Sequence, residues 1–239
     1  MPGLRQFAFP SNPFAIVILL GTVAAAVWAL SPARTQGGLH ATRSSISTPA
    51  GTVPVYVVRV SLADGRYRVA PAVAGQPLSL LNTSAAIDGA TADPVSGVPA
   101  GRLVIGGRQL VAGDPQQPAL GLAEGRAAIG TGLTGWPDLI AGGPLLVRTG
   151  RATSGIGLGD LAVREPRVAV ALSGGELWLV GAGGRGLTVP ELQRTLVSMG
   201  ARSAIAFAGG ESADLVVGGR PLLGHVELTP ADAVTVLSR

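Results

Sequence analysis

The sequence predicts an α+β fold of mostly antiparallel strands and hairpins, with one long helix packed on the sheet. Three observations predict it. The chain of 239 residues contains 36 glycines and 18 prolines, which suits many short strands joined by turns. Short apolar runs recur along the chain, and a glycine turn interrupts each of them. One segment, 188–200, carries the start and stop signals of a helix.

The predicted strands come in pairs. The run VPVYVVRV at 53–60 alternates in character and is followed by an Ala-Asp-Gly turn and a second run at 67–70, which predicts a hairpin. Further pairs are expected at 102–105 with 108–111, at 168–172 with 176–180, and around the Gly218-Gly219 turn after 214–217. The pairs follow no fixed period, which disfavours a propeller or a solenoid.

The helix begins with a capping box. Thr188 to Glu191 combines a threonine cap with a glutamate three residues later, and Pro190 occupies the first turn. Leu192, Leu196 and Met199 then fall on one face, and Gly200 ends the helix. A shorter helical turn is expected at 78–82.

The N-terminus predicts export. Residues 14–30 are apolar and uncharged, close to the ~20 residues of a membrane-spanning helix. We expect a signal anchor, with 1–13 as a short cytoplasmic region, 31–51 as a flexible linker and 52–239 as an extracytoplasmic domain on a single-pass membrane protein. Small-residue spacing around Trp28 leaves cleavage of a signal peptide, and hence secretion, as the alternative.

Composition argues against several partners. The formal net charge is +4, and all 18 basic residues are arginines scattered along the chain, while aromatic residues make up only 4%. A nucleic-acid partner is therefore not expected. The chain has no cysteine, and its two histidines, His40 and His225, lie far apart in sequence. No metal and no other cofactor is expected.

Four segments, in order, resemble blocks of the phosphodiester glycosidase family, which includes the uncovering enzyme that removes N-acetylglucosamine from a sugar phosphodiester. The segments are 81–105, similar to the family's N-G-G-F-F block and the strand after it; 140–148, similar to G-G-P-x-L-V; 166–171, similar to P-R-T-A-I-G; and 186–220, similar to a T-L-x-E-L helix followed by N-L-D-G-G-G-S-S. The resemblance covers about two-thirds of the chain and implies a domain that handles glycosyl phosphodiesters.

The departures from the family pattern fall in its last block. Ala206 stands where the family has Asn, Ala208 where it has Asp, and Glu211 where it has a third Gly. Cleavage of a glycosidic bond to phosphate needs an acid or base and a donor for the phosphate oxygens. A methyl group at Ala208 cannot supply the first of these.

The resemblance implies a set of site residues. Arg167 would hold the phosphate, and Glu211 would replace the missing acid as the catalytic group. Other substrate-binding positions would be Asn82, Ser212, Gly142, Gly143, Gly209 and Gly210. Each of these residues also has a purely structural interpretation. Arg167 can be a solvated arginine, the polar residues can be turn residues, and the glycines can serve backbone geometry.

Three functions remain open from the sequence. The first is a membrane-tethered hydrolase of glycosyl phosphodiesters. The second is a non-catalytic module that binds a sugar phosphodiester or an envelope glycan, and the third is a structural interaction domain. The alanines at 206 and 208 favour the second and third on chemical grounds.

Overall fold

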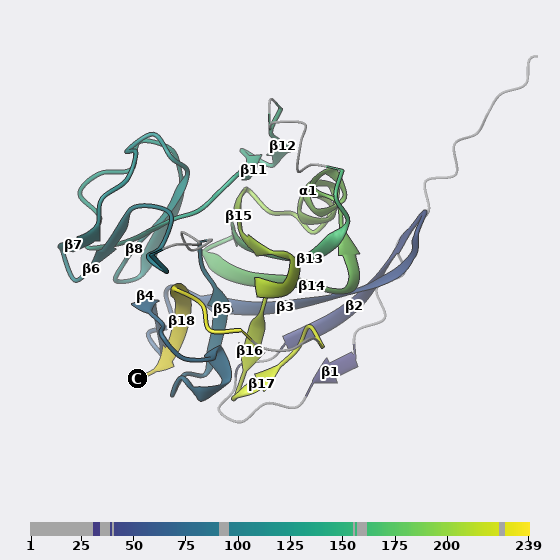
Figure 1. Cartoon of the computed structure of the whole chain (residues 1–239), viewed down its shortest axis with the longest axis horizontal. Helices are drawn as coiled ribbons and strands as arrows, with labels where there is room; N and C mark the ends of the chain where they lie inside the picture. Colours follow the sequence, from purple (N-terminus) through teal and green to yellow (C-terminus); the bar gives the residue numbers. More distant parts are fainter. Residues whose placement is uncertain are drawn as a thin grey trace, which may run out of the picture.

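The computed structural model describes residues 31–33, 39, 41–90, 96–154, 156, 162–224 and 228–239. Within these ranges antiparallel strands dominate, and one α-helix, α1 (Val189–Ser198), accompanies them (Figure 1). The predicted α+β class is confirmed at this level. The predicted anchor at 14–30, His40 and His225 lie outside the described residues. No helix among the described residues is long and apolar enough to cross a membrane.

The largest sheet has eight strands, and all its neighbouring strands are antiparallel. Its order is β1 (Ser31–Ala33), β2 (Ala41–Thr48), β3 (Gly51–Ser61), β14 (Glu176–Leu187), β13 (Glu165–Ser173), β15 (Ser203–Gly209), β11 (Leu145–Arg148) and β12 (Arg151–Ala152). We call it the large sheet.

Two five-stranded sheets complete the fold. The β8 sheet has the order β7 (Arg108–Val111), β6 (Leu103–Ile105), β10 (Asp138–Ala141), β8 (Ala119–Ala123) and β9 (Arg126–Gly130). The β5 sheet has the order β17 (Arg220–Pro221), β16 (Leu215–Val217), β5 (Ala85–Asp88), β18 (Asp232–Ser238) and β4 (Tyr67–Val73).

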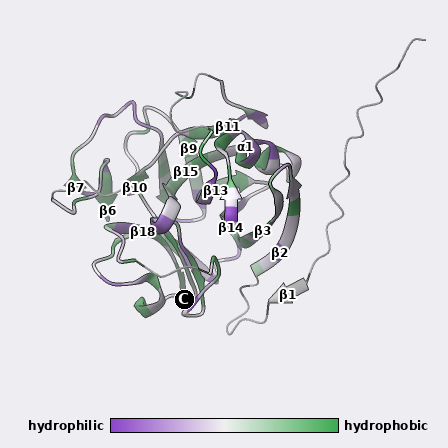
Figure 2. Ribbon diagram, turned by 45° about the vertical axis from the view of Figure 1, so that its right-hand side comes forward, coloured by the Kyte–Doolittle hydropathy of each residue, from purple (hydrophilic) through white to green (hydrophobic). Residues whose placement is uncertain are grey.

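The large sheet is buried on both faces. Successive side chains of its central strands point to opposite faces, and other elements pack against each face. On one face, Val168 and Val170 of β13 pack in a core with Ile87 and Val234 of the β5 sheet and Leu120 of the β8 sheet. Hydrophobic residues accordingly run along the central strands in Figure 2. This core joins the three sheets.

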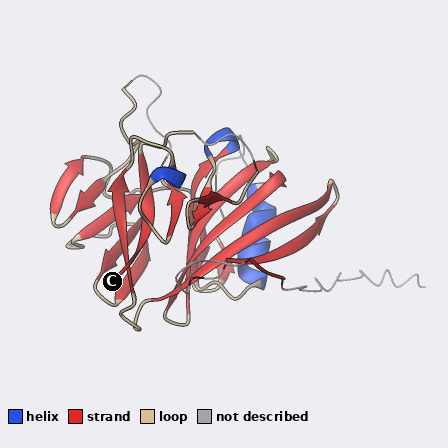
Figure 3. Ribbon diagram, turned by 90° about the horizontal axis from the view of Figure 1, so that it is seen from below, coloured by secondary structure: helices blue, strands red, loops and turns tan. Residues whose placement is uncertain are grey.

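The opposite face of the large sheet is covered by α1. Ala169 and Ala171 of β13 share a second core with Leu192 and Leu196 of the helix. The small alanine side chains allow close approach of the helix, which lies against the sheet in Figure 3.

The predicted capping box is present. The Thr188 Oγ1 accepts from the backbone N–H of Glu191 at 3.4 Å, and the Glu191 carboxylate accepts from the Thr188 N–H at 2.9 Å. Arg164 Nη2 lies 2.6 Å from the other Glu191 oxygen, so this carboxylate also ties the helix start to the segment before β13. These contacts hold the pKa of Glu191 below its ordinary value although burial opposes them.

The predicted hairpin of 53–60 with 67–70 is wrong. β3 pairs with β2 and β14, whereas β4 pairs with β18. Val57 and Val58 are consecutive and both buried, so β3 has apolar neighbours on both faces and lies in the interior of the sheet. The other expected pairs are confirmed as β6–β7, β13–β14 and β16–β17.

The predicted linker at 31–51 is also wrong for part of its length, because residues 41–48 form β2. Ala41 is buried, and the Ser44 hydroxyl donates to the Val55 carbonyl at 3.4 Å. The register runs from Ala41 opposite Val58 to Thr48 opposite Gly51. A polar sequence forms a strand here because β3 offers it an unpaired edge. The helical turn expected at 78–82 is a 3-10 turn at Leu78–Leu80.

Candidate functional site

The last family block, 186–220, passes from the large sheet into the β5 sheet. The backbone N–H of Ala208, near the end of β15, donates to the carbonyl of Gly89 at 2.9 Å. One residue earlier, Phe207 lines a cavity of about 330 Å³. The described lining of this cavity is Ala90, Ala100, Gln117, Pro118, Gly142, Gly143 and Phe207. We call it the Gly142 cavity.

Gly142 has a packing role in this cavity. A Cβ atom there would lie 2.7 Å from Phe207 Cε1 and 2.8 Å from the Ala206 carbonyl oxygen. The next residue, Gly143, donates its N–H to that same carbonyl at 2.9 Å. The two predicted glycines therefore bring the segment after β10 against β15 and form one wall of the cavity.

Arg167 is not among the described residues that line the Gly142 cavity, and its side chain is engaged in the fold. Its side chain is only 10% exposed, and it crosses from β13 to neighbouring backbone. Nε donates to the Leu187 carbonyl at 2.8 Å, and Nη2 donates to the Val163 carbonyl at 2.9 Å. Nη2 also lies 3.0 Å from Glu165 Oε1. The guanidinium thus fastens the ends of β13 and β14 together.

Glu165 was missed by the sequence reasoning. Its carboxylate lies over the Gly209-Gly210 turn, where a Cβ at Gly209 would fall 2.7 Å from Glu165 Oε1. Gly210 adopts φ +67°, a backbone conformation that glycine favours. The sequence carried no clear signal for Glu165, because it precedes the strand predicted at 168–172 and the strand register is irregular between Glu165 and Arg167.

Glu211 and Ser212 lie on the 3-10 turn Gly210–Ser212 that follows β15. Glu211 is exposed, and the Ser212 hydroxyl donates to the Gly209 carbonyl at 3.0 Å. Neither residue lines the Gly142 cavity. Asn82 is exposed and precedes the start of β5, whereas Gly89 follows the end of that strand. The structure therefore does not bring Asn82 and the Gly209-Gly210 turn together.

Three buried carboxyl groups lie next to Ala208. Asp88 ends β5, Asp232 begins β18, and Asp214 precedes β16. The backbone N–H of Asp88 donates to the Asp214 carbonyl at 3.0 Å, which places the ends of these strands together. Asp232 Oδ1 accepts from the N–H of Ala90, a residue of the cavity wall, at 2.8 Å. None of the three aspartates is among the site residues that the sequence predicts.

Burial raises the pKa values of two of these carboxyl groups. Desolvation, followed by the nearby charges of Asp232 and Asp214, raises the pKa of Asp88 to about 8. Desolvation likewise raises the pKa of Asp232 to about 7, although the hydrogen bond from Ala90 opposes it. The pair therefore retains protons near neutral pH. In the described part of the chain, no group of three or more His, Cys, Asp or Glu side chains is placed to hold a metal ion.

Residues 81–236, well over half of the chain, match the sequence model of the phosphodiester glycosidase family. The chain belongs to this family. No curated protein matches the sequence significantly.

Solved structures share the fold of this phosphodiester glycosidase domain at low sequence identity. A hypothetical protein from Synechocystis superposes with a TM-score of 0.77 at 14% identity, over 88% of this chain and 64% of its own. This chain thus spans somewhat less than two-thirds of the Synechocystis protein. The zebrafish N-acetylglucosamine-1-phosphodiester α-N-acetylglucosaminidase catalytic domain, auto-inhibited by its pro-peptide, gives 0.70 at 18% identity, over 88% of each chain. A Burkholderia pseudomallei protein that bears the name of an exported protein superposes with a TM-score of 0.56 at 14% sequence identity, over 80% of this chain and 75% of its own.

The family blocks converge in the phosphodiester glycosidase domain. Three of the four segments line the Gly142 cavity: 81–105 supplies Ala90 and Ala100, the G-G-P block supplies Gly142 and Gly143, and the last block supplies Phe207. The segment 166–171 supplies no described lining residue. Segments separated by more than 100 residues thus form one cavity. This convergence makes the Gly142 cavity the candidate site.

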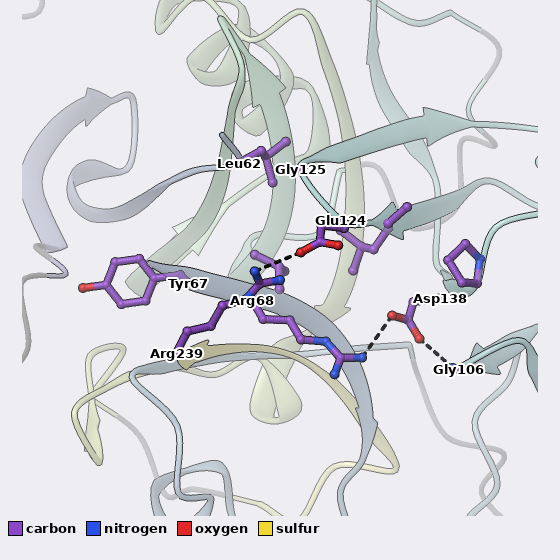
Figure 4. Close-up of a pocket in the computed structure, with 12 residues that line it drawn as sticks. Leu62, Tyr67, Arg68, Gly106, Glu124, Gly125, Asp138 and Arg239 are labelled. Atoms are coloured by element: carbon purple, nitrogen blue, oxygen red, sulfur yellow. Dashed lines mark hydrogen bonds and ion pairs between the residues drawn. The ribbon is translucent and has the colours of Figure 1, made fainter. Parts of the chain in front are cut away.

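A second hollow of about 340 Å³ lies between the β5 and β8 sheets (Figure 4). Ion pairs cross it: Arg68 Nη2 lies 3.5 Å from Asp138 Oδ2, and Arg239 Nη1 lies 3.0 Å from Glu124 Oε1. Asp138 Oδ1 also accepts from the Gly106 N–H at 2.7 Å. In the phosphodiester glycosidase domain this hollow is therefore part of the contact between the two sheets, which we call the seam.

We expect the two acids of this seam to differ in their contribution to stability. Replacing the nearly buried Asp138 with alanine leaves the Gly106 N–H unpaired and should lower the free energy of unfolding by about 1–3 kcal/mol. The Glu124 side chain is 82% exposed, so Glu124→Ala should cost less than about 0.5 kcal/mol. Urea denaturation of both variants measures the difference. Equal losses would contradict a structural role that is specific to Asp138.

Proposed function

We propose that this domain binds a glycosyl phosphodiester in the Gly142 cavity, as an exported module tethered to the membrane through residues 14–30. The single observation that carries the proposal is the convergence of family blocks on this one cavity. Its volume of about 330 Å³ falls within the range of small-molecule sites. The similar zebrafish domain is an N-acetylglucosamine-1-phosphodiester α-N-acetylglucosaminidase, which supports the choice of ligand class.

Binding without efficient turnover fits the residues on either side of the cavity residue Phe207 in the sequence. Ala206 and Ala208 bracket Phe207, and both present only methyl groups where the family motif has polar side chains. Glu211 is exposed on the turn beyond them. The amide of Gln117 is suited to hold a sugar hydroxyl, but it supplies no general acid. The N–H groups of Gly142 and Gly143 are already engaged by the carbonyls of Pro118 and Ala206.

A hydrolase is the second candidate, and one observation favours it. A glycosidase needs a carboxyl group that still carries its proton at working pH, and the pKa of Asp88 is raised to about 8. Asp88 is two residues from Ala90 in the cavity wall. In this candidate Asp88 would protonate the leaving phosphate oxygen, while water attacks the anomeric carbon and a base accepts the proton of that water.

Calorimetric titration of the full chain with nucleotide sugars and aryl glycosyl phosphodiesters tests the proposal. We expect saturable binding, and Ala100→Phe should weaken it by about tenfold or more because the added ring occupies the mouth of the cavity. Ala112→Phe, at an exposed position outside the cavity lining, is the matched control and should bind normally.

Product analysis of the same mixtures separates the two candidates. Binding without product supports the binding module. Turnover that Asp88→Asn abolishes would select the hydrolase, and absence of any binding across the ligands would overturn both.

A further inference from the structure

The edge hairpin β11–β12 places two arginines directly opposite each other. Arg148 and Arg151 are cross-strand partners, and both are exposed. Like charges at directly opposite positions repel, and this destabilises a strand pair. Only Thr149 and Gly150 separate them along the chain, so the hairpin holds both guanidinium groups on one face.

Neither arginine has a carboxylate partner among the described residues. Arg68, Arg164, Arg167 and Arg239 each form an ion pair with an acid. In contrast, no ion pair involves Arg148 or Arg151 in the described part of the chain. Two opposed cations without an acid between them form a site that a bound anion would stabilise.

A hollow of about 670 Å³ adjoins these two side chains. Its polar lining consists of two guanidinium groups and four hydroxyl groups, from Arg148, Arg151, Thr131, Thr149, Thr153 and Ser154, and no described lining residue is acidic. The Thr149 and Thr153 hydroxyls already donate to backbone carbonyls. The N–H donors for the oxygens of a phosphate group therefore come chiefly from the two guanidinium groups.

The turn of this hairpin also shows backbone strain. Thr149 has φ +49° and is the one residue other than glycine with a positive φ among those described. A threonine in this region costs free energy, and such residues concentrate at ligand-binding sites. The strained turn fixes the positions of the two arginines that flank it.

The hollow adjoins the candidate site. Pro118 lines both the hollow and the Gly142 cavity, and the consecutive residues Gly143 and Pro144 line one each. The hairpin is therefore the neighbouring feature toward which a phosphate attached to a sugar in the Gly142 cavity can extend. Arg167, the phosphate clamp predicted from the sequence, instead directs its guanidinium to Leu187, Val163 and Glu165.

We propose that Arg148 and Arg151 bind the phosphate group of the ligand whose glycosyl part occupies the Gly142 cavity. This inference rests on the proposed function for the identity of the whole ligand. The oxyanion site itself follows from the arginine pair and the lining of the hollow. The bound phosphate bridges the two guanidinium groups and removes their mutual repulsion.

The test compares two double variants of equal charge in the full chain. Arg148→Gln with Arg151→Gln removes the pair, whereas Arg108→Gln with Arg220→Gln removes two exposed arginines from β7 and β17. The probes are inorganic phosphate, pyrophosphate, a nucleotide sugar and the free sugar. We expect the hairpin variant to lose about tenfold or more in affinity for the phosphate-bearing probes and to bind the free sugar as before.

The outcomes separate this inference from the proposed function. Unchanged binding of the phosphate-bearing probes by the hairpin variant, or an equal loss in the control variant, would overturn the arginine site. A nucleotide sugar that still binds in that case leaves the proposed function intact. If phosphate and pyrophosphate bind through the arginines but no glycosyl phosphodiester binds, the oxyanion site is supported and the proposed function fails.

Discussion

Replacing Arg167 with alanine should lower the free energy of unfolding by about 3–5 kcal/mol, as expected when one partner of a buried charged pair is removed. The side chain is 10% exposed and donates to the carbonyls of Leu187 and Val163 while pairing with Glu165. Its loss leaves these acceptors and a carboxylate without their donor. The effect should appear in chemical denaturation without any ligand.

Two further variants make this prediction specific. Arg167→Lys keeps the charge but cannot reproduce the planar set of donors, so its loss should fall between those of wild type and Arg167→Ala. Arg202→Ala, at an exposed position just before β15, should stay within about 0.5 kcal/mol of wild type. An Arg167→Ala protein with wild-type stability and impaired ligand binding would restore the phosphate-clamp interpretation from the sequence.

The stability of the domain should decrease as pH rises from about 5 to about 9. The pKa of Asp88 is about 8 and that of Asp232 about 7 in the folded chain, against an ordinary value of 3.8. Over this range the folded state binds more protons than the unfolded state, so raising the pH favours unfolding. Between the unfolded and folded pKa values, each group lowers the free energy of unfolding by up to about 1.4 kcal/mol per pH unit. The full stability is therefore present only below pH ~4.

Asp88→Asn should flatten this profile and stabilise the domain at pH 8. The amide is neutral, so it removes both the cost of desolvating a charge and the repulsion with Asp232. Asp64→Asn is the matched control, because hydrogen bonds from Arg66 keep the pKa of that exposed carboxyl low and outside the tested range. Denaturation midpoints across pH 5–9 measure both variants. A flat wild-type profile, or a parallel profile for Asp88→Asn, would contradict the assignment.

Local signals in the sequence predicted the elements that depend on local contacts. The capping box at Thr188 and Glu191 fixed the start of α1, and glycine turns fixed three of the hairpins. The family resemblance brought Gly142 and Gly143 into the site, and both line the cavity. These features involve residues close in sequence or blocks with a recognisable order.

Features that depend on distant partners could not be predicted in the same way. The pairing of β4 with β18 joins residues that are far apart in sequence, such as Val73 with Asp232 and Tyr67 with Ser238, and nothing local in 67–73 indicates it. The raised pKa values of Asp88 and Asp232 follow from burial at a junction of strands, which sequence spacing does not reveal. Arg167 was placed correctly in its block, but the carbonyls that engage it come from other segments.

The place of β18 has a consequence for how the chain is completed. This strand, 232–238, lies between β5 and β4 and pairs with both. Until it is synthesised, β4 and β5 each expose an unpaired edge, so the β5 sheet forms only after residues 232–238 are available. Loss of residues 232–238, by a premature stop codon or by proteolysis, would therefore remove a strand from the middle of a sheet.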